Sequence, residues 1–276
     1  MIKIDNLTFN YKHNEVLKNI NLQFDKGSIY GLLGENGVGK TTLLKLISGL
    51  LEPKNGSCMV DGMICFERSP LFLQNIIFMP DYFALPVHET PSQLIRAWAP
   101  FYPKYSETDF LHLMKEAQVD PTRKFKEMSC GQQKKSLLAC ILSLNTDYVL
   151  LDEPTNGLDI PSKADFRRLI SQRSNEDSTI IISTHQVKDV ENLIDPIIIL
   201  SNEAVLLQAS MEEITSKLYF EYGGPQRPEA LYSEMTPSGF LNVLDNIDEE
   251  ESQVNIEALF NTVLQNPHHI QDIFTK

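Results

Sequence analysis

A glycine-rich loop followed by lysine and threonine constrains this chain more than any other feature of its sequence. GENGVGKTT (34–42) lies between an apolar run at 29–33, expected to be a strand, and an apolar run with helical spacing at 43–51. The glycines allow tight, positive-φ turns that aim successive backbone N–H groups at one anion, and the new helix adds its positive N-terminal end. Lys40 would then reach the terminal phosphates of a nucleotide, and Thr41 would hold Mg²⁺.

Composition narrows the classes of protein that can carry this loop. The 276 residues are 42% hydrophobic and 22% charged, which suits one large domain with an extension or two domains. A net charge of −13 argues against a duplex-DNA partner, an acidic substrate or an anionic membrane surface. The 4 cysteines form no C-x-x-C pair and have no histidine at metal spacing, which indicates reduced thiols in a cytosolic protein.

Neither a secretion signal nor a membrane span is expected. The N-terminal sequence MIKIDNLTFN lacks the basic and apolar regions of a signal peptide. Apolar runs all fall short of the roughly 18 residues that cross a bilayer. A membrane role would therefore have to come through a partner.

Alternation of apolar and polar residues predicts two antiparallel strands ahead of the loop, at 2–11 and 16–24. Tyr11 ends the first strand, where a tyrosine can stack on a nucleobase. An ordinary surface aromatic at a strand end explains this residue, taken alone, more simply. A further short hairpin arm is expected at 58–62.

An inserted helical subdomain is expected over about residues 82–145. The apolar strand predicted at 76–79 stops at Pro80, and the composition then changes to helices with loops. The last helix follows MSCGQQKK (128–135), where Ser129 precedes a helix N-terminus that could bind an anion. By itself this helix start is weak evidence for a site.

Two later apolar strands each lead into ionisable residues. YVLLDEP has the pattern of a central parallel strand, and it ends in Asp152 and Glu153. Adjacent strand residues point to opposite faces, so Asp152 is expected beside Thr41 at Mg²⁺, and Glu153 is expected to orient or deprotonate a water molecule. A solvated strand end is the alternative for this pair alone. His185 follows the next strand, on the edge where nucleotide phosphates should lie, although a lone histidine is usually structural or exposed.

The character of the chain changes again after about residue 219. Glycines and prolines give a linker-like stretch: Gly223, Gly224, Pro225 and Pro228. A final amphipathic helix needs something to cover its apolar face, formed by Ile256, Leu259, Phe260, Val263 and Leu264. We expect this face to pack on the preceding part of its own chain or on a second subunit; a small appendage folded on its own is the alternative.

Taken together, these residues resemble the nucleotide-binding subunit of an ATP-binding cassette (ABC) transporter over about residues 1–210, with six motifs in the family's order. The resemblance implies ATP and Mg²⁺ as cofactors. The residues that it assigns to ATP are the adenine-stacking Tyr11, the Walker A residues Gly34, Asn36, Gly37, Gly39, Lys40, Thr41 and Thr42, the signature residues Ser129, Gly131 and Gln132, and Asp159, the last residue of the D-loop NGLD (156–159). It assigns Mg²⁺ to Thr41, Asp152 and Asp81, and catalysis to Glu153, the switch histidine His185 and Lys40. The signature residues would meet the ATP of the opposite subunit.

The resemblance also implies a fold. It is an α/β fold with a P-loop NTPase core, a RecA-like mixed sheet, an antiparallel β subdomain, the inserted helical subdomain at about 82–145 and a small C-terminal extension. The ABC ATPase domain would span residues 1–210, and the extension residues 211–276.

Two residues depart from the family's pattern. The signature reads MSCGQ instead of LSGGQ, so Cys130 stands near the expected γ-phosphate contact. Ser129 and Gly131 remain, and we expect tolerance. Asp81 stands where the family usually has a glutamine that touches Mg²⁺ and the attacking water and links the site to the membrane subunit. A shorter, charged side chain puts both roles in question.

The leading hypothesis is an ATPase subunit that dimerises, with itself or with a paralogous subunit, around two ATP molecules and drives a separately encoded membrane permease. It would be cytoplasmic and peripheral on the inner face of the cell membrane, with no nucleic acid partner. A soluble ABC ATPase acting on nucleic acid or ribosomes is one alternative. A nucleotide-gated module that hydrolyses weakly because of Asp81 and Cys130 is another.

Overall fold

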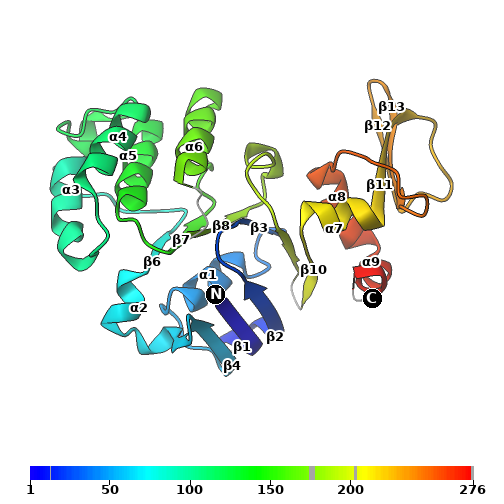
Figure 1. Ribbon diagram of the computed structural model, residues 1–276, viewed down its shortest axis with the longest axis horizontal. Coiled ribbons are helices and arrows are strands. Elements are labelled where there is room, and N and C mark those ends of the chain that lie inside the picture. Colours follow the sequence, from blue (N-terminus) through cyan, green and yellow to red (C-terminus); the bar gives the residue numbers. More distant parts are fainter. Residues whose placement is uncertain (13, 174–177, 202–203, 275–276) are drawn as a thin grey trace.

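The centre of the computed structural model is a six-stranded sheet (Figure 1). The structure describes residues 1–12, 14–173, 178–201 and 204–274. The spatial order is β10 (Val205–Ala209), β9 (Ile197–Leu200), β3 (Ile29–Leu33), β8 (Thr179–Thr184), β7 (Tyr148–Asp152) and β6 (Ile76–Met79). β10 runs antiparallel to β9, and the other neighbours pair in parallel, which makes the sheet mixed.

Side chains on the two faces of this sheet belong to two different cores. In β7, Tyr148 and Leu150 pack with α1 (Lys40–Ile47) and the strands of the β subdomain. Val149 and Leu151 point the other way, into a core shared with the helical subdomain and the C-terminal part of the chain. Burial on both faces explains why this strand reads as a continuous apolar run.

The antiparallel β subdomain lies below the central sheet in Figure 1. Its strand order is β2 (Asn14–Phe24), β1 (Ile2–Tyr11), β4 (Asn55–Val60) and β5 (Met63–Ile64). The strands predicted at 2–11 and 16–24 and the hairpin arm at 58–62 are confirmed. A turn η1 (Cys65–Glu67) and a short helix α2 (Pro70–Gln74), which the sequence analysis did not predict, connect β5 to β6.

Three helices form the subdomain between β6 and β7. They are α3 (Pro91–Trp98), α4 (Glu107–Glu116) and α5 (Cys130–Ser143), with the turns η2 (Ala99–Phe101) and η3 (Phe125–Glu127). Helix α5 packs against α3 and α4 within the subdomain and against α6 (Ile160–Arg173) outside it, so it connects the subdomain to the core. Thr90 and Ser129 each begin a helix with a capping box, in which the side chain and the third helical residue satisfy each other's backbone N–H groups.

The C-terminal part corrects one prediction. Gly223 and Gly224 do not form a linker, because they end strand β11 (Leu218–Gly224) of a third sheet. The elements beyond the central sheet are the turn η4 (Val187–Asp189) after β8, α7 (Met211–Lys217), then β11, β12 (Tyr232–Thr236), β13 (Gly239–Asp245), α8 (Ile256–Gln265) and α9 (Pro267–Phe274). Strand β13 lies between β11 and β12 and pairs antiparallel with both. We call residues 218–274 the C-terminal module.

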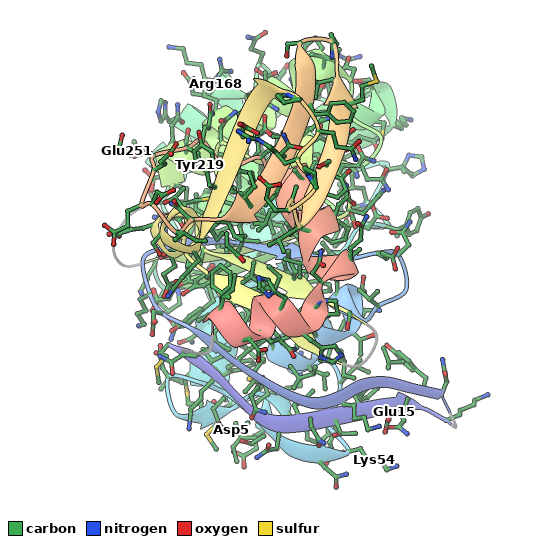
Figure 2. All side chains as sticks on the ribbon, turned by 90° about the vertical axis from the view of Figure 1, so that its right-hand side faces the viewer. Asp5, Glu15, Lys54, Arg168, Tyr219 and Glu251 are labelled. Atoms are coloured by element: carbon green, nitrogen blue, oxygen red, sulfur yellow. The ribbon has the colours of Figure 1, made fainter. Side chains whose placement is uncertain are left out.

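The module packs on its own cassette. The α8 residues Ile256, Leu259 and Val263 are at most 2% exposed and share the core of the central sheet and helical subdomain. Helix α9 packs against β10 at the edge of the sheet, and α8 packs against η4. Figure 2, which faces the module, shows its three strands standing above the two helices.

The fold class is therefore the one expected, and residues 1–210 and 211–276 remain our division of the chain. Among the described residues, no helix has the length and apolar character needed to cross a bilayer.

Candidate nucleotide site

The loop at 34–39 joins β3 to α1 and takes conformations that favour glycine. Gly37 and Gly39 have φ of 88° and 105°, in the left-handed region where a Cβ atom is strained. At Gly34 the limit is space, since a Cβ atom there would lie 2.6 Å from the carbonyl oxygen of Leu200. The loop can therefore keep its backbone N–H groups pointing inward at the start of a helix, where an anion is favoured.

Lys40 is buried at the centre of this loop. Its ammonium donates to the carbonyl oxygens of Gly34 at 2.7 Å and Glu35 at 3.1 Å, and lies 3.7 Å from Oε1 of Glu153. Burial lowers the pKa of Lys40, and the carboxylates of Glu153 and Asp152 oppose that shift. A charged ammonium held in this way is available to phosphate oxygens that enter the loop.

Thr41 and Asp152 meet as the sequence predicted. The Thr41 hydroxyl donates to Oδ2 of Asp152 at 2.7 Å, and the Ser183 hydroxyl donates to Oδ1 at 2.6 Å. Asp152 is only 2% exposed, so these two hydroxyls are what compensate its buried charge. Hydroxyl and carboxylate oxygens are hard ligands of the kind that Mg²⁺ selects, so the pair fits that ion.

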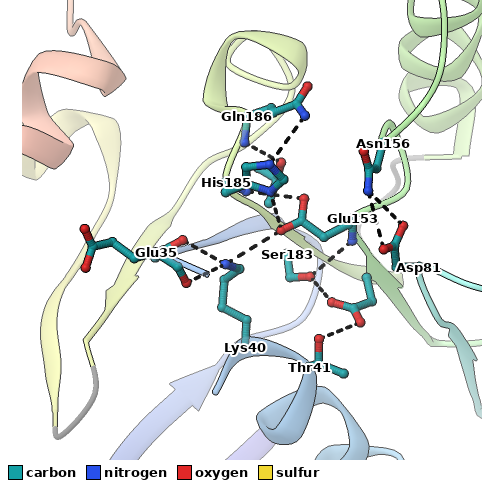
Figure 3. Close-up of polar contacts among 12 residues, drawn as sticks. Glu35, Lys40, Thr41, Asp81, Glu153, Asn156, Ser183, His185 and Gln186 are labelled. Atoms are coloured by element: carbon teal, nitrogen blue, oxygen red, sulfur yellow. Dashed lines mark hydrogen bonds and ion pairs between the residues drawn. The ribbon is translucent and has the colours of Figure 1, made fainter. Parts of the chain in front are cut away.

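Glu153 and His185 form the polar end of the site (Figure 3). Nδ1 of His185 lies 2.9 Å from Oε1 of Glu153, and the His185 backbone N–H donates to Oε2 at 3.3 Å. Glu153 has φ of 45°, a left-handed conformation that is uncommon for a residue with a side chain. The turn after β7 therefore aims this carboxylate at both Lys40 and His185.

Beside these residues lies a cavity of about 390 Å³, whose lining does not include Gly34, Asp152 or His185. Its lining includes the predicted Tyr11, Asn36, Gly37, Gly39, Lys40, Thr41, Thr42, Asp81 and Glu153. Tyr11 is 44% exposed and stacks edge-on against Phe9, with ring centroids 4.8 Å apart, so part of its surface stays available to a base. The structure thus brings together most of the residues assigned to one nucleotide.

Comparison with known proteins identifies this arrangement. A family model described as ABC transporter matches residues 17–156, which is half of the chain. The ABC transporter ATP-binding protein YtrB of Bacillus subtilis (strain 168) is 32% identical over 215 residues, covering 78% of this chain and 73% of YtrB. The chain belongs to the ABC transporter family.

Other relatives agree with this assignment. The lantibiotic transport ATP-binding protein SrtF of Streptococcus pyogenes is 29% identical over 236 residues, covering 84% of this chain and 96% of SrtF. Among solved structures, the ATP-binding cassette MJ0796, a dimer in a post-hydrolysis state bound to ADP and Pi, has the same fold. Its TM-score is 0.67 at 23% identity, over 76% of this chain and 99% of that one. The chain is thus an ATP-binding subunit of an ABC transporter.

The signature residues of this ABC subunit lie outside the cavity. The Ser129 hydroxyl accepts from the Gln132 backbone N–H at 3.3 Å and starts α5, where Cys130 is exposed. A Cβ atom at Gly131 would lie 2.7 Å from Oγ of Ser162, so a side chain there would require Ser162 to shift. Asp159 begins α6 by accepting from the Ser162 backbone N–H at 3.0 Å. Contact of Ser129, Gly131, Gln132 and Asp159 with nucleotide remains a prediction.

Metal binding at Asp81 also remains a prediction. Asp81 lines the cavity, but its hydrogen-bonding and ionic partners are Asn156 and Lys134. Within the described ranges, His, Cys, Asp and Glu form no group of three or more able to hold a metal. Because Mg²⁺ usually keeps several waters and takes phosphate ligands, one or two carboxylates beside Thr41 are enough for it.

The sequence analysis missed Ser183 and Lys134. Ser183 lies near the end of β8, just before Thr184 and His185. Its position opposite Asp152 follows only from the pairing of β7 with β8. Lys134 stands in the quoted MSCGQQKK run, but its contact with the D-loop depends on how α5 packs. The basic residues that follow the signature were the sequence signal that could have indicated Lys134.

Proposed function

We propose that this subunit hydrolyses ATP in a Mg²⁺-dependent reaction and drives a separately encoded membrane permease. The observation that carries the proposal is the cluster of Lys40, Glu153 and His185: Lys40 and Glu153 line the cavity together with the phosphate-binding loop, and His185 contacts Glu153. A buried ammonium, a carboxylate and an imidazole are the groups that bind phosphate, orient water and brace a terminal phosphate.

Thr41 and Asp152 would hold Mg²⁺, which when bound neutralises phosphate charge. Their hydroxyl and carboxylate face each other across the end of β7, with Ser183 fixing the second carboxylate oxygen. Asp81, the third ligand expected from the sequence, is paired with Asn156 and Lys134 and is not needed for this arrangement. In this arrangement the protein supplies a small, oriented set of oxygen atoms and leaves most of the ion's coordination to phosphate and water.

Glu153 would orient the attacking water and accept its proton. His185 now holds the Glu153 carboxylate at 2.9 Å, which keeps the base aimed into the cavity. Lys40 would exchange its contacts with the carbonyls of Gly34 and Glu35 for the β- and γ-phosphates. These exchanges leave each buried charge paired throughout.

A second subunit would complete the site. Ser129, Gly131, Gln132 and Asp159 resemble ATP-contacting elements of the family, yet they lie outside the cavity of their own chain. We propose that they meet the ATP of a second copy or of a paralogous ATPase subunit. The relationship to a dimeric cassette of the same fold supports this arrangement.

An apolar groove supports the assignment of a permease partner. A cavity of about 590 Å³ runs between α2, β6 and the helical subdomain and is lined mainly by large apolar side chains. Phe101 on its rim is 70% exposed, and Phe83 packs edge-on against Trp98 at its base. A permease segment seated there would place the complex on the inner face of the membrane, and co-purification with a polytopic protein would detect it.

The substitution Glu153→Gln tests the hydrolytic proposal. The amide keeps the shape of the side chain but removes the negative acceptor, so steady-state ATP turnover should fall at least about 100-fold while ATP stays bound. The variant should also accumulate as an ATP-bound dimer in size-exclusion chromatography. Glu52→Gln, on the exposed turn after α1, is the matched control and should keep wild-type turnover. Near-normal turnover by Glu153→Gln would remove the assignment.

A further inference from the structure

The carboxylate of Asp81 faces the D-loop and a partly buried lysine, Lys134. Its two oxygens lie 3.4 Å and 3.4 Å from Nδ2 of Asn156, as the dashed lines in Figure 3 show. Nζ of Lys134 lies 3.8 Å from Oδ1. Asp81 follows β6, Asn156 follows β7 and Lys134 belongs to α5, so three separate segments of the chain meet at this carboxylate.

Lys134 also contacts the backbone of the D-loop. Its ammonium donates to the backbone carbonyl oxygen of Asn156 at 2.6 Å. Asn156 is therefore held twice, through its main chain by Lys134 and through its side-chain amide by Asp81. The loop connects to the catalytic carboxylate by a tight turn, because the Asn156 backbone N–H donates to the carbonyl oxygen of Glu153 at 3.1 Å.

Charge explains why a carboxylate suits position 81 in this chain. The Lys134 side chain is 18% exposed and Asp81 is 44% exposed, so the lysine is the more desolvated partner. Within the described residues, Asp81 is the ion-pair partner found for Lys134. The glutamine usual in the family could bond Asn156 but would leave this ammonium without a counter-charge in a mostly buried setting.

We propose that Asp81 is a positioning residue whose pairing with Lys134 and Asn156 holds the D-loop, and through it Glu153, in register with the helical subdomain. The departure from glutamine is then matched to Lys134. Asp81 also lines the nucleotide cavity, so the same carboxylate joins that cavity to α5, the helix that the signature begins. The proposal concerns the site of the proposed ATPase, but it can be tested without nucleotide.

Hydrogen exchange of the nucleotide-free protein, measured by mass spectrometry over residues 153–159, reports on this loop directly. The backbone N–H groups of Asn156 and Leu158 are both hydrogen-bonded within the turn. Asp81→Asn should speed their exchange by about fivefold, the effect of losing one charge-assisted contact on a partly exposed loop. Asp81→Gln should behave alike, and Asp81→Glu should restore part of the protection.

A double-mutant cycle with Lys134→Met separates pairing from independent effects. If the two residues act together, the double variant should exchange no faster than the faster single variant. Asp147→Asn is the matched control, because it breaks the ion pair of Asp147 with Lys104 elsewhere on the helical subdomain and should leave residues 153–159 unchanged.

Two results would overturn the proposal. One is additive acceleration in the double variant. The other is unchanged exchange in Asp81→Asn; a raised Mg²⁺ requirement for ATP binding in the same variant would then assign Asp81 to the metal and not to the loop. Neither result depends on ATP turnover, so the proposed ATPase activity is tested independently of this proposal.

Discussion

The phosphate-binding loop and the C-terminal module lie on one chain, but different physical causes produce them. In the loop, local requirements select each residue: Gly37 and Gly39 adopt positive φ, and Lys40 is buried among carbonyl oxygens. In the module, three strands and two helices depend on packing with the cassette, through side chains such as Leu259. A motif can therefore be recognised from the sequence, whereas a packed module cannot be recognised in the same way.

The two regions also differ in what holds them together. Charged and polar contacts, including those of Lys40, Asp152 and Glu153, dominate the nucleotide site. Apolar burial attaches the module, and one exposed ion pair, Lys188 with Glu257 at 2.7 Å, links it to the η4 turn just after His185. Changes in the first region should therefore affect chemistry, and changes in the second should affect stability.

The largest effect should come from Lys40→Met. It removes the buried ammonium that we assign to the phosphates, and ATP turnover should fall by about 100- to 1000-fold. The thermal unfolding midpoint should change little by comparison, because a methionine of similar length can fill the site. Lys45→Met, one turn later on the partly exposed face of α1, is the control and should retain turnover. Equal losses of ATP turnover in Lys40→Met and Lys45→Met would contradict the view that changes at the nucleotide site act specifically on chemistry.

A smaller effect, on stability and not on ATP turnover, is expected from Leu259→Ala. This α8 side chain is 0% exposed, so its truncation should lower the free energy of unfolding by about 2–5 kcal/mol in urea titrations. ATP affinity should stay near wild type, because Leu259 lies outside the nucleotide cavity. Met235→Ala, in the same module but 78% exposed, should change stability by less than about 0.5 kcal/mol. Loss of ATP binding in Leu259→Ala would show that the module supports the site.

The smallest effect should come from Glu257→Gln, which breaks the ion pair with Lys188. Both side chains are more than half exposed, at 51% and 75%, so solvent and salt screen the pair. The free energy of unfolding should fall by less than about 1 kcal/mol, and the difference should shrink as salt is added. ATP turnover measured alongside would sharpen the comparison, since a change larger than the stability change would make this contact a link between the module and His185.

The sequence determined the nucleotide site because each of its parts meets a local demand. Glycines at positive φ, a lysine after them and acids at the end of an apolar strand are recognisable without knowing what lies nearby in space. Alternation of apolar and polar residues predicted the antiparallel strands, a change of composition predicted the helical subdomain, and the family resemblance implied the α/β core. The helix expected after Ser129 is α5, which begins with a capping box.

Tertiary structure decided the features that depend on distant residues. The third sheet was missed because Gly223 and Gly224 suit a linker as well as a strand end, and only pairing with β13 selects the strand. The amphipathic face of α8 was predicted to pack on its own cassette or on a second subunit, and only the structure selects the first, because periodicity shows that a face must be buried and not what buries it. Likewise, the pairing of Asp81 with Lys134 arises from residues 53 positions apart in the chain, brought within 3.8 Å by the packing of α5 on the core.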